Sequence, residues 1–136
     1  MGFTAHHPAG KFDYTAGDVI QFTDVQSNFG NYYDSNDCTF FVPYRGIYVF
    51  TVSVTAHGYY GLYVEIFKEN VILAEAVAES SASGAGDFYQ SSSIFVVVQC
   101  EKGEYVYART GEETSDYLRA FSDRSTQFSG YLLYLN

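Results

Sequence analysis

Two stretches of this chain combine aromatic rings with hydrogen-bonding side chains, the combination that sugar binding requires. The first is His57-Gly58-Tyr59-Tyr60-Gly61, and the second runs from 116 to 124. An aromatic face packs against the apolar side of a sugar ring, while carboxylates and guanidinium groups bond its hydroxyls. An equal alternative is that the paired tyrosines border a strand end or a subunit contact. The candidate ligand-binding residues are Tyr59, Tyr60, Asp87, Tyr117, Arg119, Asp123 and Arg124.

Catalytic motifs are absent from the sequence, which contains no Gly-x-Ser-x-Gly, His-Glu-x-x-His, Walker or dinucleotide-binding pattern. His6 and His7 precede Pro8 near the start of the chain, where we expect an exposed loop and not a metal site. His57 follows a long apolar segment and is expected at the surface. Cys38 has no neighbour that would lower its pKa, so we expect no nucleophile and no enzyme.

Charge and apolar length exclude two classes of partner. The net charge is −9 and Lys plus Arg number only 7, so no basic surface is available for nucleic acid. The longest strongly apolar stretch, 94–98, is far too short to insert into a membrane. Two cysteines, Cys38 and Cys100, allow one disulfide or two buried thiols, and the sequence leaves both open.

The composition favours β-strands, because aromatic residues make up 19% of the chain and β-branched residues lie beside them. From 46 to 56, residues alternate between two faces with the period of two that a strand has. Segment 71–78 contains Ala and Glu and could also form a helix, but its flanking turns favour a strand. A single domain, 1–136, with short strands and polar turns predicts a sandwich or barrel. We expect strands at 19–25, 39–42, 46–56, 62–67, 71–78, 91–99, 105–109 and 128–135.

The spacing of one set of residues resembles the globular head of complement C1q: Phe22, Asn28, Tyr33, Phe40, Gly46, Tyr48 and Phe50. Val52 stands where the pattern usually has one more aromatic. Phe3-Thr4-Ala5 resembles the family's opening strand, Lys102-Gly103-Glu104 the turn before a later strand, and Phe128-Ser129-Gly130-Tyr131-Leu132 its closing strand. The resemblance implies an all-β, ten-stranded jelly-roll sandwich of two antiparallel sheets, shared with the tumour necrosis factor superfamily.

The same resemblance implies a homotrimer, and it raises the question of which apolar residues face the threefold axis. Tyr48, Phe50, Phe128 and Leu132 are candidates for the core or for the trimer interface, and the core is the better interpretation. Some family members bind calcium through loop carboxylates. Asp87, Glu112, Glu113 and Asp116 could attempt this, but they have no recognisable ligand spacing, and Asp34, Asn36 and Asp37 are better explained as turn caps. We therefore expect no cofactor, with calcium as an open alternative.

A chain with this head and no collagen repeat resembles the stand-alone soluble members of the family found in invertebrates. The resemblance implies a secreted, lectin-like pattern-recognition protein of innate immunity that binds glycans or microbial surface molecules and gains avidity from three sites. One alternative is a trimeric cytokine or synaptic organiser that binds a protein receptor. Another is an acidic extracellular matrix or mineral-associated protein, in which the charge attracts cations diffusely.

Overall fold

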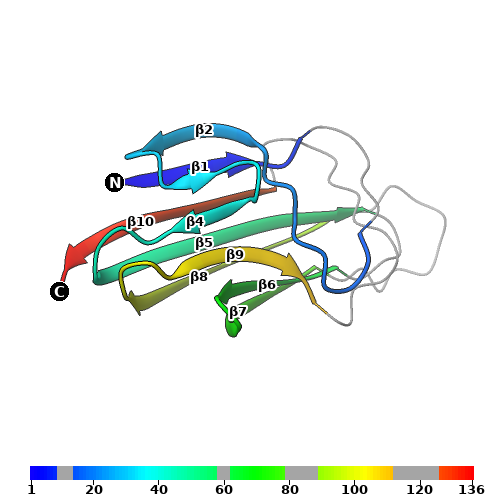
Figure 1. Ribbon diagram of the computed structural model, residues 1–136. Coiled ribbons are helices and arrows are strands. Elements are labelled where there is room, and N and C mark those ends of the chain that lie inside the picture. Colours follow the sequence, from blue (N-terminus) through cyan, green and yellow to red (C-terminus); the bar gives the residue numbers. More distant parts are fainter. Residues whose placement is uncertain (9–13, 58–61, 79–88, 112–125) are drawn as a thin grey trace.

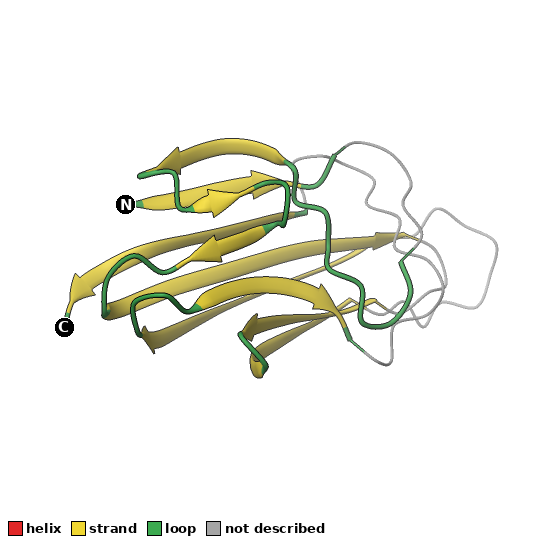
Figure 2. Ribbon diagram, in the orientation of Figure 1, coloured by secondary structure: helices red, strands yellow, loops and turns green. Residues whose placement is uncertain are grey.

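The computed structural model describes residues 1–8, 14–57, 62–78, 89–111 and 126–136, and these residues form two packed layers of β-sheet (Figure 1). Figure 2 shows that strands and short connections account for the described chain. The ten strands in these ranges are β1 (Gly2–His6), β2 (Asp24–Phe29), β3 (Tyr33–Asp34), β4 (Thr39–Phe41), β5 (Gly46–His57), β6 (Leu62–Lys68), β7 (Val71–Ala78), β8 (Tyr89–Cys100), β9 (Tyr105–Thr110) and β10 (Gln127–Leu135).

Each layer is a five-stranded antiparallel sheet. The first sheet has the order β2-β1-β10-β5-β8, and the second has the order β3-β4-β9-β6-β7. The last strand, β10, lies in the middle of the first sheet between β1 and β5. Both termini therefore lie at the same end of the sandwich (Figure 1). The prediction of a jelly-roll sandwich of ten strands in two antiparallel sheets is confirmed.

The core lies between the sheets and is dominated by aromatic rings. In β5 every second residue points inward, and Tyr48, Phe50, Val52 and Val54 are each 0% exposed. Phe50 stacks on Tyr48 at 6.1 Å between ring centroids and meets Phe40 edge-on at 5.7 Å. Phe128 of β10 packs against Phe3 of β1 at 4.9 Å. Such edge and offset contacts stabilise aromatic pairs beyond simple burial, so this cluster fixes the distance between the sheets.

The prediction of a strand at 19–25 was wrong. Ile20 and Phe22 are fully buried, as alternation would predict, but Phe22 N–H donates to the carbonyl of Ile20 at 3.0 Å, and only Val19 forms an isolated bridge, to Arg109. The segment therefore turns tightly while it buries alternate side chains. Regular pairing begins at Asp24, where the chain meets β1.

Asn28 explains why a polar residue belongs to the family-like pattern. Its side-chain Nδ2 donates to the carbonyl of Tyr33 at 2.7 Å, and its Oδ1 accepts from the Tyr33 N–H at 3.1 Å. The amide thus closes the turn between β2 and β3, where Gly30 and Asn31 adopt positive φ. The turn cluster at 34–37 is also confirmed, because Asp34 Oδ1 accepts from the Asn36 N–H at 2.8 Å, as expected of a turn cap.

Candidate assembly surface

The residues predicted to bind ligand all lie outside the described residues, and so do the carboxylates considered for calcium. These are Tyr59, Tyr60, Asp87, Tyr117, Arg119, Asp123 and Arg124 for the ligand, and Asp87, Glu112, Glu113 and Asp116 for the ion. Within the described residues, no group of three or more His, Cys, Asp and Glu side chains could hold a metal ion. Across the same ranges, no helix is long and apolar enough to cross a membrane.

The four residues considered for core or trimer contact lie inward. Tyr48, Phe50 and Phe128 are each 0% exposed within one protomer, and Leu132 is partly buried against the core. The three aromatic rings among them make the intramolecular contacts described above. The Tyr48 hydroxyl donates to the carbonyl of Tyr44 at 2.8 Å. A surface for association must therefore come from other residues.

The outer face of the first sheet provides such a surface. The strand register places two rows of side chains across all five strands, and we call these rows together the assembly face. The apolar row is Phe29, Gly2, Tyr131, Val49 and Val97, and the hydroxyl row is Ser27, Thr4, Ser129, Thr51 and, at its end, Phe95. None of these ten residues is charged. Val49 is only 7% exposed, but Phe29, Phe95, Val97 and Tyr131 each expose 46% or more of their surface, so a partner could bury apolar area here.

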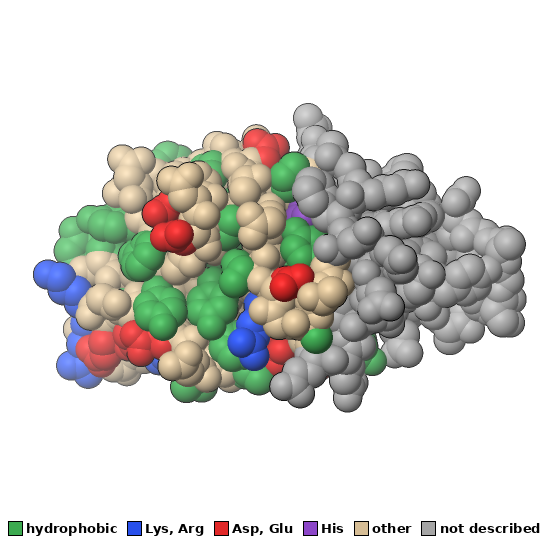
Figure 3. Space-filling model, turned by 45° about the vertical axis from the view of Figure 1, so that its right-hand side comes forward, with side chains coloured by type: hydrophobic (Ala, Val, Ile, Leu, Met, Phe, Trp, Pro, Cys, Tyr) green, Lys and Arg blue, Asp and Glu red, His purple; other side chains and the backbone are tan. Residues whose placement is uncertain are grey.

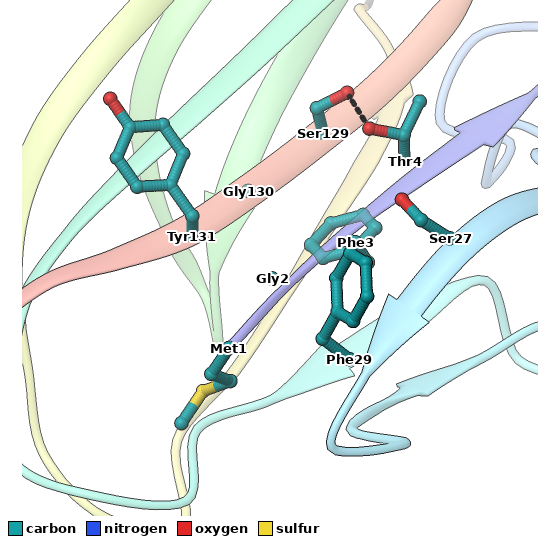
Figure 4. Close-up of a pocket in the computed structure, with 9 residues that line it drawn as sticks. All are labelled: Met1, Gly2, Phe3, Thr4, Ser27, Phe29, Ser129, Gly130 and Tyr131. Carbon is teal, nitrogen blue, oxygen red and sulfur yellow. Dashed lines mark hydrogen bonds between the residues drawn. The ribbon is translucent and has the colours of Figure 1, made fainter.

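A hollow of about 270 Å³ interrupts the assembly face at β1 (Figure 4). Gly2 forms its floor. No side chain fits at this position, because a Cβ would lie only 2.9 Å from the carbonyl oxygen of Gly130. Phe29 and Tyr131 rise on either side, at 69% and 46% exposure. The Thr4 and Ser129 hydroxyls bond each other at 2.9 Å at its polar end. The hollow is therefore an apolar notch with one hydrogen-bonding wall.

The outer face of the second sheet is different in character. Tyr105, Tyr107 and Phe67 stack on one another at 6.0 and 5.6 Å, and the Arg109 guanidinium lies 3.9 Å above the Phe67 ring. On the face shown in Figure 3, hydrophobic and acidic side chains are interspersed. Cross-strand contacts of this kind between neighbouring side chains stabilise a sheet. The rings of Tyr105, Tyr107 and Phe67 are thus partnered within their own sheet, whereas Val71 and Ile72 of β7 remain 59% and 52% exposed.

His7 corrects a prediction, because it is 0% exposed and does not lie in an exposed loop. Its Nδ1 lies 2.9 Å from the carbonyl oxygen of Pro8, so Nδ1 carries the proton and donates. Nε2 then accepts from the Tyr14 hydroxyl at 2.6 Å, and the same hydroxyl accepts from the Gln21 N–H at 3.1 Å. The ring is held neutral, since burial lowers the pKa of His7 below its usual 6.5.

Acid is expected to weaken the fold through His7. The folded pKa lies below 6.5, so as the pH falls through 6.5 the unfolded chain binds the proton first and stability is lost. Above that pH both states are neutral, and the effect vanishes. Between pH 7.5 and 5.5 we expect urea unfolding to show a loss of stability that the His7→Gln variant does not show. Equal pH dependence in the two proteins would contradict this assignment.

Cys38 and Cys100 are free thiols, which decides between the two alternatives that the sequence left open. They are 1% and 0% exposed, and burial raises the pKa of both. For Cys100 the pKa rises from 9.0 to about 11, so the reactive thiolate near pH 8 becomes about 100-fold scarcer. We expect a disulfide reagent to leave the folded protein unreacted over minutes and to titrate both thiols after unfolding. Rapid labelling of the native protein would refute this.

The family model of the C1q domain matches residues 2–133. The chain belongs to the C1q domain family. The family-like spacing that begins at Phe22 is thereby confirmed, and the residues that carry it have structural roles within this C1q domain.

Individual relatives agree with this membership. Complement C1q tumor necrosis factor-related protein 3 of Mus musculus is 28% identical over 115 residues, which cover 85% of this chain and 44% of that protein. The chain thus spans less than half of the length of this curated relative. The globular domain of zebrafish complement 1qA protein has a TM-score of 0.76 at 15% identity and covers 99% of this chain and 98% of its own.

A second solved structure extends the likeness of fold beyond C1q. Eiger TNF from S. frugiperda has a TM-score of 0.75 at 9% identity, and the match covers 100% of this chain and 94% of that one. At such identities the likeness concerns the fold alone. The C1q domain described here therefore shares its jelly roll with the tumour necrosis factor fold, as the sequence predicted.

Proposed function

We propose that this C1q domain belongs to a secreted, non-enzymatic binding protein that assembles as a homotrimer through the assembly face. C1q and tumour necrosis factor family proteins form trimers, are typically secreted and are generally not enzymes, which supports each part of the proposal. The trimer would present three equivalent sets of loops to a ligand.

One observation carries this proposal: the assembly face is uncharged in a chain of net charge −9. Two copies of so acidic a protein repel each other, and the repulsion is smallest where the facing surfaces have no charge of their own. Val97 at 54% exposure and Phe95 at 70% exposure leave apolar area in water in the isolated protomer. Burial of this area between copies would supply the driving force for assembly.

The ligands we propose are glycans or other microbial surface molecules, which would make the protein a lectin-like recognition molecule of innate immunity. The support comes from the sequence, where aromatic rings accompany guanidinium and carboxylate groups in 57–61 and 116–124. Each site would bind weakly, and a multivalent surface would be held by three sites at once. Calcium could take part through the loop carboxylates.

A protein receptor is the second candidate ligand. The mouse relative is a tumor necrosis factor-related protein by name, and the insect structure is itself a tumour necrosis factor. A trimer of this type would bind its receptor through surfaces that two neighbouring copies form together. This function needs no sugar-binding loop.

Sedimentation and glycan binding test the proposal together. We expect a mass about three times the 15.2 kDa protomer at micromolar concentration, and a monomer would refute the assembly.

On a glycan array, with and without a chelator, we expect selective signals that free sugar competes away. Replacing Tyr59 and Tyr60 with alanine should reduce these signals, whereas Tyr44→Ala, at a half-exposed tyrosine elsewhere, should not. A blank array from folded trimer would favour the protein receptor.

A further inference from the structure

Phe29, Gly2 and Tyr131 form a slot on the assembly face that is open to water and shaped for a ring (Figure 4). The three residues lie on adjacent strands β2, β1 and β10, in one row of the register. The outer two are therefore two strand spacings apart, or roughly 9.6 Å. A ring inserted midway would lie about 4.8 Å from each neighbour, within the range of favourable aromatic contacts.

The volume of the slot suits a phenyl ring. An apolar cavity of about 150 Å³ suffices to hold benzene, and this hollow measures about 270 Å³. The floor cannot fill the slot from below, because Gly2 has no room for even a Cβ beside the Gly130 carbonyl. Only a group that enters from above can therefore fill the slot.

Phe95 is the most exposed large hydrophobic residue among the described ones, at 70%. It lies on β8, the edge strand of the same sheet, and its neighbours along the hydroxyl row are Thr51 and Ser129. The central strand of the slot, β1, is three strand spacings away, or roughly 14 Å. A phenylalanine side chain cannot cross that distance, so Phe95 cannot fill the slot of its own chain.

We propose that Phe95 of one copy inserts into the slot of the next copy and anchors the trimer. This inference rests on the proposed assembly and specifies how it is made. Because the projecting ring and the slot lie on different strands of one face, the contact joins two different surfaces. Such a contact can repeat from copy to copy, and in a closed trimer it provides three identical anchors.

Charge favours a second copy as the occupant over an acidic or basic partner. The slot is bounded by uncharged side chains, and so are the neighbours of Phe95 along its row. A ring buried at the centre of an interface among near-neutral polar contacts is the usual form of an energetic hot spot. The hydroxyl row would supply those polar contacts around the anchor.

Tryptophan fluorescence tests the anchor directly, because the chain contains no tryptophan. The Phe95→Trp variant has one indole, whose emission shifts to the blue when it leaves water. We expect blue-shifted emission at concentrations where sedimentation gives a trimer, and a red shift on dilution to monomer. Ile72→Trp, at an exposed position of the second sheet, is the matched control and should emit in the red throughout.

A slot variant identifies the pocket that receives the ring. Adding Phe29→Ala to Phe95→Trp should move the emission to the red and weaken assembly at least tenfold. Trimeric Phe95→Trp protein with water-exposed emission would overturn the anchor and leave the proposed trimer intact. Wild-type protein that stays monomeric would instead refute the assembly itself, so the two failures are distinguishable.

Discussion

The Phe50→Ala variant is expected to lose about 3–5 kcal/mol of unfolding free energy, as buried phenylalanine-to-alanine changes do. Phe50 is 0% exposed and touches the rings of Phe40, Tyr48 and Phe128, so its removal leaves a cavity between the sheets. The ring also packs directly on the backbone of β10, because a Cβ at Gly130 would be 2.5 Å from Phe50 Cδ1, so its removal leaves this backbone without a packing partner. Urea unfolding at one fixed protomer concentration measures the loss.

Phe41→Ala is the matched control, because this ring is 41% exposed and lies on the second sheet. We expect less than half of the loss seen with Phe50→Ala. Similar losses in the two variants would mean that the aromatic cluster does not determine the stability of the sandwich.

The Val97→Glu variant is expected to abolish the trimer while leaving the protomer folded. Val97 is 54% exposed in one copy, so a carboxylate there remains in water in the monomer. In the assembled protein each of three interfaces would bury one unpaired charge, at several kcal/mol per ion. Association should weaken at least about 100-fold, which sedimentation across a dilution series measures.

Val71→Glu provides the control for this variant, with the same change at a valine of 59% exposure on the second sheet. It makes the net charge more negative by the same amount as Val97→Glu does, so it separates the effect of position from that of charge. If both variants dissociate alike, general repulsion and not the assembly face governs association. If neither dissociates, the copies meet elsewhere.

Periodicity in the sequence predicted most of the strands, and the family resemblance predicted their arrangement in two sheets. The segment 46–56 alternates with a period of two, and the structure confirms two distinct faces by burying Tyr48, Phe50, Val52 and Val54. The strand predicted at 71–78 has the bounds of β7, although its composition also suited a helix. The segment forms a strand because it pairs with β6, and this pairing depends on residues outside the segment itself.

Other features could not be predicted because they depend on contacts far along the chain. His7 looked like an exposed residue beside Pro8, but the turning segment at 14–22 supplies Tyr14 as its partner, and the Gln21 N–H bonds the same hydroxyl. The assembly face escaped prediction for a similar reason. Its rows join residues as distant as Phe29 and Tyr131, and only the register of five strands brings them into line.

The place of β10 has a consequence for how the domain is made. Of the ten described strands this one is synthesised last, yet it occupies the centre of the first sheet, between β1 and β5. Until it arrives, β1 lacks its inner neighbour and Phe3 lacks the ring of Phe128. Pairings of such long sequence separation form slowly and expose apolar surface in the meantime. A nascent chain therefore cannot complete this sheet, or offer its surface to another copy, before synthesis has passed Leu135.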